Sequence, residues 1–173
     1  DGSLGVLFWL DNTPYIATRG SFTSEQAEWA TGWLWRNLNF HQFDRSKTYL
    51  FEIIYKENQI VVRYDFEGLV LLAVRDTATG QEDDIDQYRD IFPYVVEKIA
   101  PTDLATLAEM DTPNSEGFVI HWPSTGLRMK IKFSSYVRLH RILTGMSEKS
   151  LWELLSTGQD LNAYMENVPD EFL

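Results

Sequence analysis

The sequence contains no cysteine among its 173 residues. That absence excludes a disulfide framework, a zinc site built on thiolates and a cysteine nucleophile. Histidine is scarce: the three histidines have no metal-ligand spacing, and neither an H-E-x-x-H nor a G-x-S-x-G motif occurs. The glycine-rich loops G-x-x-x-x-G-K-[ST] and G-x-G-x-x-G, which cradle phosphates in many nucleotide-binding proteins, are missing as well.

No apolar run approaches the ~18 residues that a membrane-spanning helix needs, and no signal-peptide pattern is present. Hydrophobic residues make up 44% of the chain and aromatic residues 14%, with six tryptophans. This composition excludes extensive disorder and supports one domain with a sizeable core. Together with the absence of cysteine, it leads us to expect a cytoplasmic protein without a membrane partner.

Positive charge is scarce overall, since the formal net charge is −11. A negative total argues against bulk attraction to nucleic acid. Acidic residues are nevertheless absent between Glu116 and Glu148. That interval contains five cationic residues, namely Arg128, Lys130, Lys132, Arg138 and Arg141. This distribution indicates either a local anion site or a solvated charged face.

Hydrophobic periodicity predicts an α+β fold, with flanking helices around a mainly antiparallel sheet. Strands are expected within 3–18, which holds two strands around a turn, and at 48–55, 59–64, 69–75, 117–122 and 127–133. Helices are expected at 23–38, at 84–100, where Pro93 interrupts or restarts the helix, and at 147–168, where the helix is broken at Gly158. We expect one domain at 1–146 and the start of a helical region at 147–173.

The helix at 23–38 has a recognisable beginning. Thr23 with Gln26 three residues later forms a capping-box pattern, which predicts Thr23 as the N-cap. The aromatic residues of this segment are able to stack on nucleic-acid bases. At helical spacing, however, they are more typical of a hydrophobic core.

The segment LRMKIKF, residues 127–133, has a strict alternation. Strand side chains alternate between faces, so Arg128, Lys130 and Lys132 share one face at a spacing of ~7 Å. The other face is expected to be core, with Leu127, Met129, Ile131 and Phe133. Three cations this close together indicate either an anion site or a solvent-exposed edge strand protected by lysine.

Three further positions are candidates for chemistry. Glu52 lies inside an apolar strand, where a carboxylate needs a partner such as a ligand hydroxyl or a cation. Glu116 and Gly117 begin a strand, where glycine permits close approach of backbone or ligand and the carboxylate could hold a metal ion. Arg19 lies on a turn before a helix and is suited to phosphate. A salt bridge, a common turn and a surface arginine are the respective structural alternatives.

These elements occur in a recognisable order. D-G-S at 1–3, R-G-S at 19–21, F-E-I-I at 51–54, E-G-F-V at 116–119 and K-I-K at 130–132 follow one another along the chain. In this order they resemble the motifs of the covalent nucleotidyltransferases, which include polynucleotide ligases and mRNA capping enzymes. The sequence between the motifs resembles that of the phage-type, ATP-dependent RNA ligases of the RNA ligase 1 class most closely, from residue 1 to about residue 142.

The resemblance implies a role for each matching residue. Glu52 is expected to contact the adenosine ribose, and Lys130 and Lys132 the α-phosphate. Glu116 is expected to help hold a divalent metal ion, with Gly117 allowing close approach. Glu52, Glu116 and the two lysines form the implied catalytic set. Fixed cations of this kind stabilise charge that develops on phosphate oxygens during attack on phosphorus.

The first motif of the family is K-x-D-G, of which Asp1 and Gly2 match the last two positions. The resemblance places the nucleophilic lysine two residues before Asp1, and no lysine within the chain is followed by x-Asp-Gly. The sequence is therefore expected to begin inside this motif. Arg19 matches the position of a basic residue near the nucleotide.

The function implied is ATP-dependent joining of RNA 3′-hydroxyl and 5′-phosphate ends through enzyme-adenylate and RNA-adenylate intermediates. ATP and Mg²⁺ or Mn²⁺ are the implied cofactors, and single-stranded or nicked RNA ends are the implied partners. One alternative is a nucleotide- or RNA-binding module without catalysis. Another is a DNA ligase or a capping-type nucleotidyltransferase.

Overall fold

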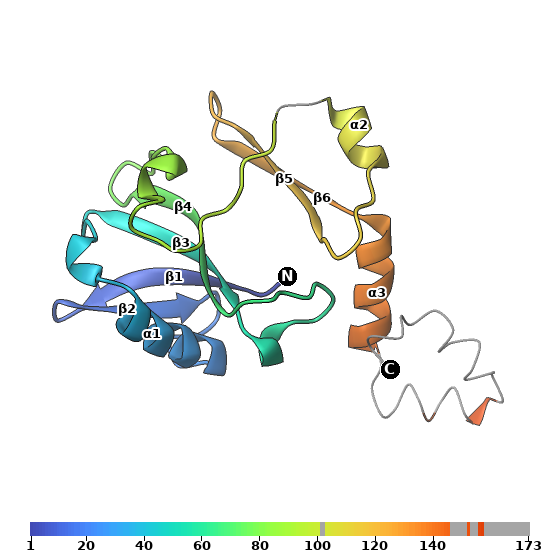
Figure 1. Ribbon diagram of the computed structural model, residues 1–173, viewed down its shortest axis with the longest axis horizontal. Coiled ribbons are helices and arrows are strands. Elements are labelled where there is room, and N and C mark those ends of the chain that lie inside the picture. The colour runs from blue at the N-terminus through green and yellow to red at the C-terminus, as the bar shows by residue number, and fades with distance from the viewer. Residues whose placement is uncertain (101–102, 146–151, 153–155, 158–173) are drawn as a thin grey trace. The chain divides into compact units, whose positions relative to one another are not determined.

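The computed structural model describes residues 1–100, 103–145, 152 and 156–157 (Figure 1). The chain divides into two compact units. The first contains Asp1–Gln59 and Tyr64–Ala100, and the second contains Ile60–Arg63 and the described residues that follow position 102. Both units combine antiparallel strands with a few helices, which confirms the predicted α+β class.

The first unit is built on a four-stranded antiparallel sheet with the order β2-β1-β3-β4. Its strands are β1 (Ser3–Leu10), β2 (Thr13–Thr18), β3 (Lys47–Ile54) and β4 (Gly68–Asp76). Asp11 and Asn12 join β1 to β2 with φ values of 46° and 68°. These residue types tolerate positive φ, and two such residues form the tight turn that joins antiparallel strands. All four strands were predicted.

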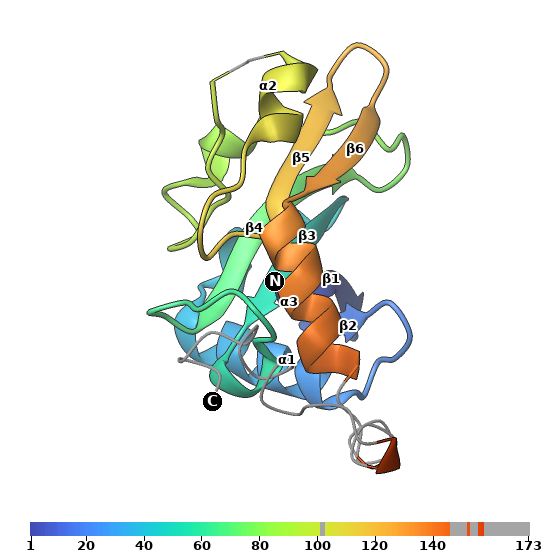
Figure 2. The same cartoon turned by 90° about the vertical axis from the view of Figure 1, so that its right-hand side faces the viewer.

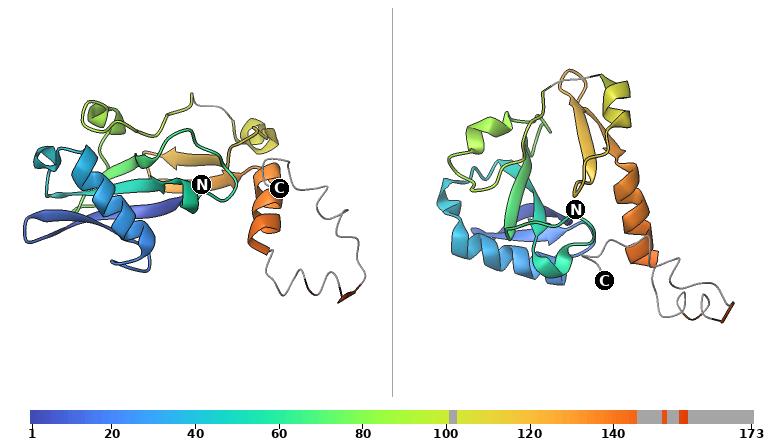
Figure 3. Two further views of the ribbon diagram at one scale, coloured as in Figure 1. Left: turned by 60° about the horizontal axis from the view of Figure 1, so that its bottom comes forward. Right: turned by 45° about the vertical axis from the view of Figure 1, so that its right-hand side comes forward.

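One face of this sheet is buried beneath helix α1 (Glu25–Asn37) (Figure 3). The register gives this face its apolar side chains, which are Leu7, Ile16, Phe51, Ile53, Leu69 and Leu71. Helix α1 packs Ala30 and Leu34 into the same core, where both are fully buried. The opposite face is only partly buried and includes Leu4, which is 44% exposed.

Helix α1 begins one residue later than predicted. The hydroxyl of Ser24, and not that of Thr23, accepts the N–H of Ala27 at 3.3 Å. The Ser24 hydroxyl also lies 3.0 Å from that of Thr18 at the end of β2, which fixes the start of the helix. The prediction that the aromatic residues of this helix belong to the core is confirmed for Trp29 and Trp33, which pack against it. Trp35 is 45% exposed.

The outer edge of β2 is covered by side chains of α1. The Ile16 N–H donates to the Thr31 hydroxyl at 2.9 Å, and the Trp35 indole N–H donates to the Pro14 carbonyl at 2.8 Å. An edge strand presents unpaired backbone groups, and here two of them are satisfied by a helix.

The predicted helix at 84–100 is wrong. Only the short 3₁₀ turn η3 (Ile85–Tyr88) forms there. The chain then runs extended, and Leu71 of β4 donates to the Tyr94 carbonyl and accepts from the Val96 N–H, both at 2.9 Å. Pro93 has no N–H for a helix, and Val95 is β-branched, so pairing with β4 prevails over the helical pattern.

The predicted strand at 59–64 is also wrong. The 3₁₀ turn η2 (Lys56–Asn58) covers the residues just before it, and 59–64 form no strand, although Val61 and Val62 are buried. The side chain of Asn114 bonds both backbone groups of Arg63, accepting its N–H at 2.6 Å and donating to its carbonyl at 2.8 Å. A side-chain amide thus replaces the neighbouring strand.

The second unit centres on a two-stranded hairpin followed by a helix (Figure 2). Its elements are α2 (Leu104–Glu109), β5 (Gly117–Trp122), β6 (Leu127–Lys132) and α3 (Ser134–Gly145). The hairpin was predicted, but α2 and α3 were not, and nor was the 3₁₀ turn η1 (Phe40–Gln42) of the first unit. Phe133 and Tyr136 are 2% and 4% exposed and form the core beside β6.

Helix α3 is anchored at its first turn by Asp111. Its carboxylate accepts the Ser134 hydroxyl at 2.9 Å, the Ser135 N–H at 3.2 Å and the Ser135 hydroxyl. These bonds lower the pKa of Asp111, with that from the Ser135 hydroxyl contributing most. Of the helices predicted at 147–168, the structure describes only residues 152 and 156–157, and the expected boundary between residues 146 and 147 lies outside the described residues.

None of the helices in the described part of the chain combines the length and the apolar character required to cross a bilayer.

Candidate functional site

Glu52 lies on the partly buried face of the four-stranded sheet. It is directly opposite Leu4 of β1 on one side and Val70 of β4 on the other. Directly opposed residues share a face, with Cβ atoms ~4.5–5.5 Å apart. The side chain of Glu52 is 24% exposed, so its carboxylate is within reach of a ligand on this face.

The first residues of the chain lie against Glu52. The backbone nitrogen of Asp1 is 3.7 Å from Glu52 Oε1 and donates to the Tyr64 hydroxyl at 2.9 Å. A Cβ atom on Gly2 would lie 3.2 Å from Glu52 Oε1 and 2.5 Å from the Ile53 carbonyl oxygen. Position 2 therefore requires glycine, and the D-G motif and the F-E motif, separated by about 50 residues in sequence, are brought together.

Arg19 follows the last residue of β2, Thr18, which pairs with Gly5 of β1. Gly5 is next in sequence to Leu4, the residue opposite Glu52, so β2 ends at the end of the sheet where Glu52 lies. Its side chain is exposed. Within the described part of the chain, no carboxylate comes within ion-pair distance of its guanidinium, which is therefore available to an anion.

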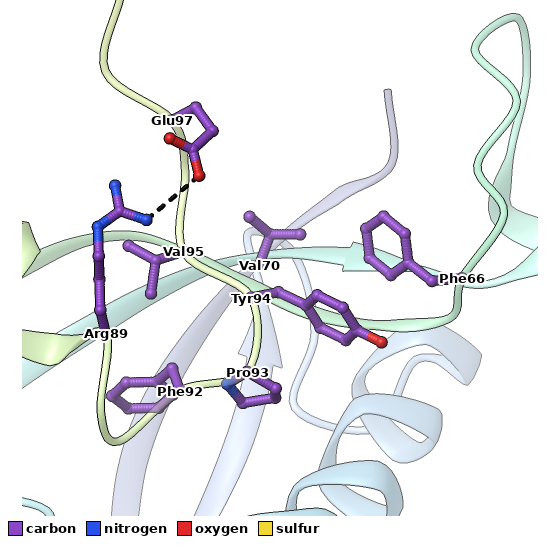
Figure 4. Close-up of a pocket in the computed structure, with 8 residues that line it drawn as sticks. All are labelled: Phe66, Val70, Arg89, Phe92, Pro93, Tyr94, Val95 and Glu97. Atoms are coloured by element: carbon purple, nitrogen blue, oxygen red, sulfur yellow. Dashed lines mark hydrogen bonds and ion pairs between the residues drawn. The ribbon is translucent and has the colours of Figure 1, made fainter.

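A hollow of about 280 Å³ lies beside β4 in the first unit (Figure 4). Val70, the residue opposite Glu52, contributes to its wall, and the ring of Tyr94 stacks on that of Phe66 with centroids 4.3 Å apart. The remaining lining residues are Arg89, Phe92, Pro93, Val95 and Glu97. The Arg89 guanidinium is 3.2 Å from the Glu97 carboxylate at one side. The hollow is mainly aromatic and aliphatic, as a pocket for a flat ring requires.

Tyr64, Phe66 and Tyr94 are residues that the sequence analysis did not single out. Tyr64 bonds Asp1, its ring lies 5.7 Å from that of Phe66, and Phe66 in turn stacks on Tyr94. These aromatic rings form a continuous strip from the D-G motif to the hollow. The alternation of aromatic and charged residues in RYDFEG, residues 63–68, is the sequence signal for this strip.

In the second unit, Glu116 and Lys132 form an ion pair, with Glu116 Oε1 2.9 Å from Lys132 Nζ. Burial raises the pKa of Glu116, but the bond from Lys132 and the positive charges of Lys132 and Lys130 outweigh it and hold the pKa below its ordinary value. The Lys132 ammonium also lies 4.9 Å from the centre of the Tyr136 ring. Glu116 is therefore ionised at neutral pH.

The register confirms that the cations of β6 alternate as predicted. Arg128, Lys130 and Lys132 lie opposite His121, Val119 and Gly117 of β5, all on one face of the hairpin. The prediction that the other face is core is wrong for two residues, because Leu127 is 60% exposed and Met129 is 39% exposed. Only Ile131, half-buried, and Phe133, buried, fit it. A two-stranded hairpin has too little material packed on it to cover its outer end.

Gly117 lies at a position where a side chain does not fit, as its residue type suggests. Its φ is +144°, and a Cβ atom there would lie 2.0 Å from the carbonyl oxygen of Ile131. The group that approaches so closely is the backbone of β6. This approach lets the Phe133 N–H bond the Glu116 carbonyl at 2.9 Å, which extends the strand pairing to the ion pair.

A divalent metal ion fits this site only together with a substrate. The described residues contain no group of three histidine, aspartate or glutamate side chains that could hold a metal. Mg²⁺ is commonly bound through one or two carboxylates plus substrate phosphates and water. Glu116 offers one such carboxylate, already ionised and adjacent to cations that attract phosphate.

The chain is similar in fold to a structure of an RNA ligase from Naegleria gruberi with PPi, at a TM-score of 0.61 and 16% sequence identity. The likeness covers 82% of this chain and 49% of that chain, so this chain spans about half the length of its neighbour. No protein-family model matches the sequence. The described part of the chain therefore shares its fold with part of this RNA ligase.

Proposed function

We propose that this chain is the nucleotidyltransferase domain of an ATP-dependent RNA ligase. The observation that carries the proposal is the fold likeness to an RNA ligase, because the ordered motifs suggested the same class independently of the fold. The PPi bound to that neighbour is the product that ATP releases in the first step of this chemistry.

The reaction has three steps. An uncharged lysine amine attacks the α-phosphorus of ATP, the bond to the β-phosphate breaks and pyrophosphate leaves. An oxygen of an RNA 5′-phosphate then attacks the phosphorus of the lysine-AMP, which breaks the P–N bond and returns the lysine. Finally an RNA 3′-hydroxyl attacks the 5′-phosphorus, AMP leaves, and the hydroxyl proton is released. In the motif that Asp1 and Gly2 match, the position of the nucleophilic lysine is two residues before Asp1.

The first unit supplies the nucleoside contacts. The base enters the hollow beside Val70, and the Glu52 carboxylate accepts a hydrogen bond from a ribose hydroxyl. Support comes from the position of Val70 directly opposite Glu52, and from the strip of aromatic rings that links the hollow to Asp1. Arg19, at the same end of the sheet, contacts a phosphate. Asp1 and Gly2 bring the preceding residues to Glu52.

The second unit supplies the phosphate contacts. Lys130 and Lys132 share a face of β6 and stabilise negative charge on the α-phosphate oxygens. In this chemistry, fixed cations at the α-phosphate also lower the pKa of the attacking lysine amine, which keeps the nucleophile uncharged. Glu116 would hold Mg²⁺ or Mn²⁺, which polarises phosphate oxygens when bound. Gly117 keeps the Glu116 carbonyl paired with Phe133.

Mass spectrometry of the intact full-length protein after incubation with ATP and Mg²⁺ tests the proposal. We expect one covalent AMP on the lysine two residues before Asp1, and none on a variant with alanine at that position. An adduct formed with GTP in place of ATP would indicate a capping-type enzyme. Joining of DNA ends in preference to matched RNA ends would indicate a DNA ligase. A full-length protein that binds ATP but forms no adduct would support a nucleotide-binding module instead.

A further inference from the structure

A second hollow, of about 300 Å³, lies beside Lys132 on helix α3. Its lining residues are Lys132, Tyr136, Val137, His140 and Arg141. All belong to the second unit. Four of the lining residues belong to the helix, at positions i, i+1, i+4 and i+5, so they share one side of α3. They are Tyr136, Val137, His140 and Arg141. The hollow is therefore a continuous feature of one helix and the end of one strand.

Its walls combine ring surface with positive charge. Tyr136 is 4% exposed and forms the floor, and the ring of His140 lies 5.6 Å from it. His140 is half-buried, whereas Val137 and Arg141 are exposed and form the rim. A nucleobase needs a ring or aliphatic surface to stack on, and its phosphate needs a cation, so the lining suits one nucleotide.

Arg141 is the cation that this hollow offers to an incoming anion. Lys132 is already paired with Glu116 at 2.9 Å, and the charge of Arg138 contributes to the lowered pKa of Asp111. Among the residues that the structure describes, no carboxylate lies within ion-pair distance of Arg141. Helix α3 itself contains no acidic residue. Arg141 can present its planar group to two phosphate oxygens at once.

We propose that this hollow binds the nucleotide at the 5′-phosphate end of the RNA, with its phosphate on Arg141 and its base between His140 and Val137. The inference rests on the proposed function. In that reaction the RNA 5′-phosphate must reach the α-phosphorus that Lys132 stabilises, and the hollow begins at Lys132. A phosphate of ATP is the other source of the same anion, and the experiment separates the two.

The experiment measures binding of the full-length protein to a short single-stranded RNA with a 5′-phosphate and to the same RNA with a 5′-hydroxyl. Fluorescence anisotropy gives both dissociation constants, and ATP affinity is measured by calorimetry on each variant. Arg141→Ala, Arg141→Lys and His140→Ala are compared with Arg36→Ala, which removes one charge from an exposed position of α1. Melting temperatures check that each variant folds.

We expect the native protein to prefer the 5′-phosphate by about ten- to a hundredfold, the scale of a charged hydrogen-bonded contact. Arg141→Ala abolishes this preference and Arg141→Lys keeps part of it. His140→Ala weakens the binding of both RNAs to the same degree. The slope of binding against salt falls by about 0.7 for the lost phosphate contact on single-stranded RNA. Arg36→Ala retains the full preference.

Two results would overturn this assignment. If Arg141→Ala leaves the preference for the 5′-phosphate unchanged, the RNA end binds elsewhere. If it weakens ATP binding as much as RNA binding, the hollow holds the triphosphate. Neither measurement requires formation of the lysine-AMP, so a protein that never adenylates but shows the Arg141-dependent preference would refute the ligase proposal and leave the RNA site standing.

Discussion

Replacement of Gly117 by alanine should open the β5–β6 hairpin at the end that carries Glu116. The backbone there has a φ of +144°, which side-chain-bearing residues rarely adopt. The added Cβ would lie 2.0 Å from the Ile131 carbonyl oxygen and 2.8 Å from the Lys132 Cα atom. Both are backbone atoms of the paired strand, so no rotation of a side chain relieves the overlap.

The expected loss of hairpin stability in Gly117→Ala has two contributions. A residue held in a sparsely populated backbone region costs roughly 1–3 kcal/mol. Separating the strands enough to remove the overlap also breaks backbone hydrogen bonds, among them that from the Phe133 N–H to the Glu116 carbonyl, and each contributes a net ~0.5–1.5 kcal/mol. We therefore expect the hairpin to lose roughly 2–4 kcal/mol of local stability.

Gly126 provides the matched control. It lies in the turn of the same hairpin with a φ of +68°, and nothing lies within 4 Å of an added Cβ. Gly126→Ala therefore carries only the left-handed strain of ~1–2 kcal/mol. Native-state hydrogen exchange of the β5 and β6 amides measures the opening free energy in both variants. Equal protection in the two would refute the argument that the approach of β6 requires glycine at position 117.

Three further predictions test other parts of the structure. Lys132→Ala should raise the pKa of Glu116, because burial then acts against weaker opposition; carboxyl NMR titration measures it. In the native protein the lowered pKa means that this pair stabilises the fold fully above pH 4.5, and that the stabilisation is lost as the pH falls below it; an acid-denaturation curve that does not change in Lys132→Ala would contradict this. Lys130→Ala and Lys132→Ala should each weaken ATP binding by ~1.5–3 kcal/mol, the scale of a charged hydrogen bond; the melting temperature should change little in Lys130→Ala, whereas Lys132→Ala also loses the pair with Glu116, and normal affinity in both would favour an exposed edge strand without a ligand. Thr31→Val should cost ~1–3 kcal/mol in urea unfolding, because it leaves the buried Ile16 N–H without its acceptor; a variant as stable as the native protein would mean that water replaces the hydroxyl.

Local patterns were sufficient for the elements whose partners are adjacent in sequence. The β1–β2 and β5–β6 hairpins follow from alternation and turn residues, and the alternation of Lys130 and Lys132 follows from the period of a strand. The helix predicted from the apolar pattern at 84–100 does not form, because this segment pairs with β4, which is distant in sequence. Pairing of Tyr94 and Val96 with Leu71 is a tertiary contact that no local window contains.

The candidate site shows the same division. The motifs located Glu52 and the residues around Lys132 because their types and spacing carry the chemistry. The hollow beside Val70 was not predictable, because Phe66 and Tyr94 are separated by 28 residues and meet only through the fold of the chain around β4. Among the five cations between Glu116 and Glu148, the sequence alone does not distinguish Arg141 from Arg138. Its distinction from Arg138 depends on Asp111, which lies far from it in sequence.

The covered edges of the first unit's sheet have a consequence for solubility. Exposed strand edges recruit further strands from other molecules, and an isolated domain with two such edges tends to assemble into fibrils or amorphous deposits. Here Thr31 and Trp35 bond β2 on one side, and the segment around Tyr94 bonds β4 on the other. At these positions a foreign strand finds its hydrogen-bonding partners already engaged. The sheet can therefore keep one broad face accessible to solvent without becoming a template for polymerisation.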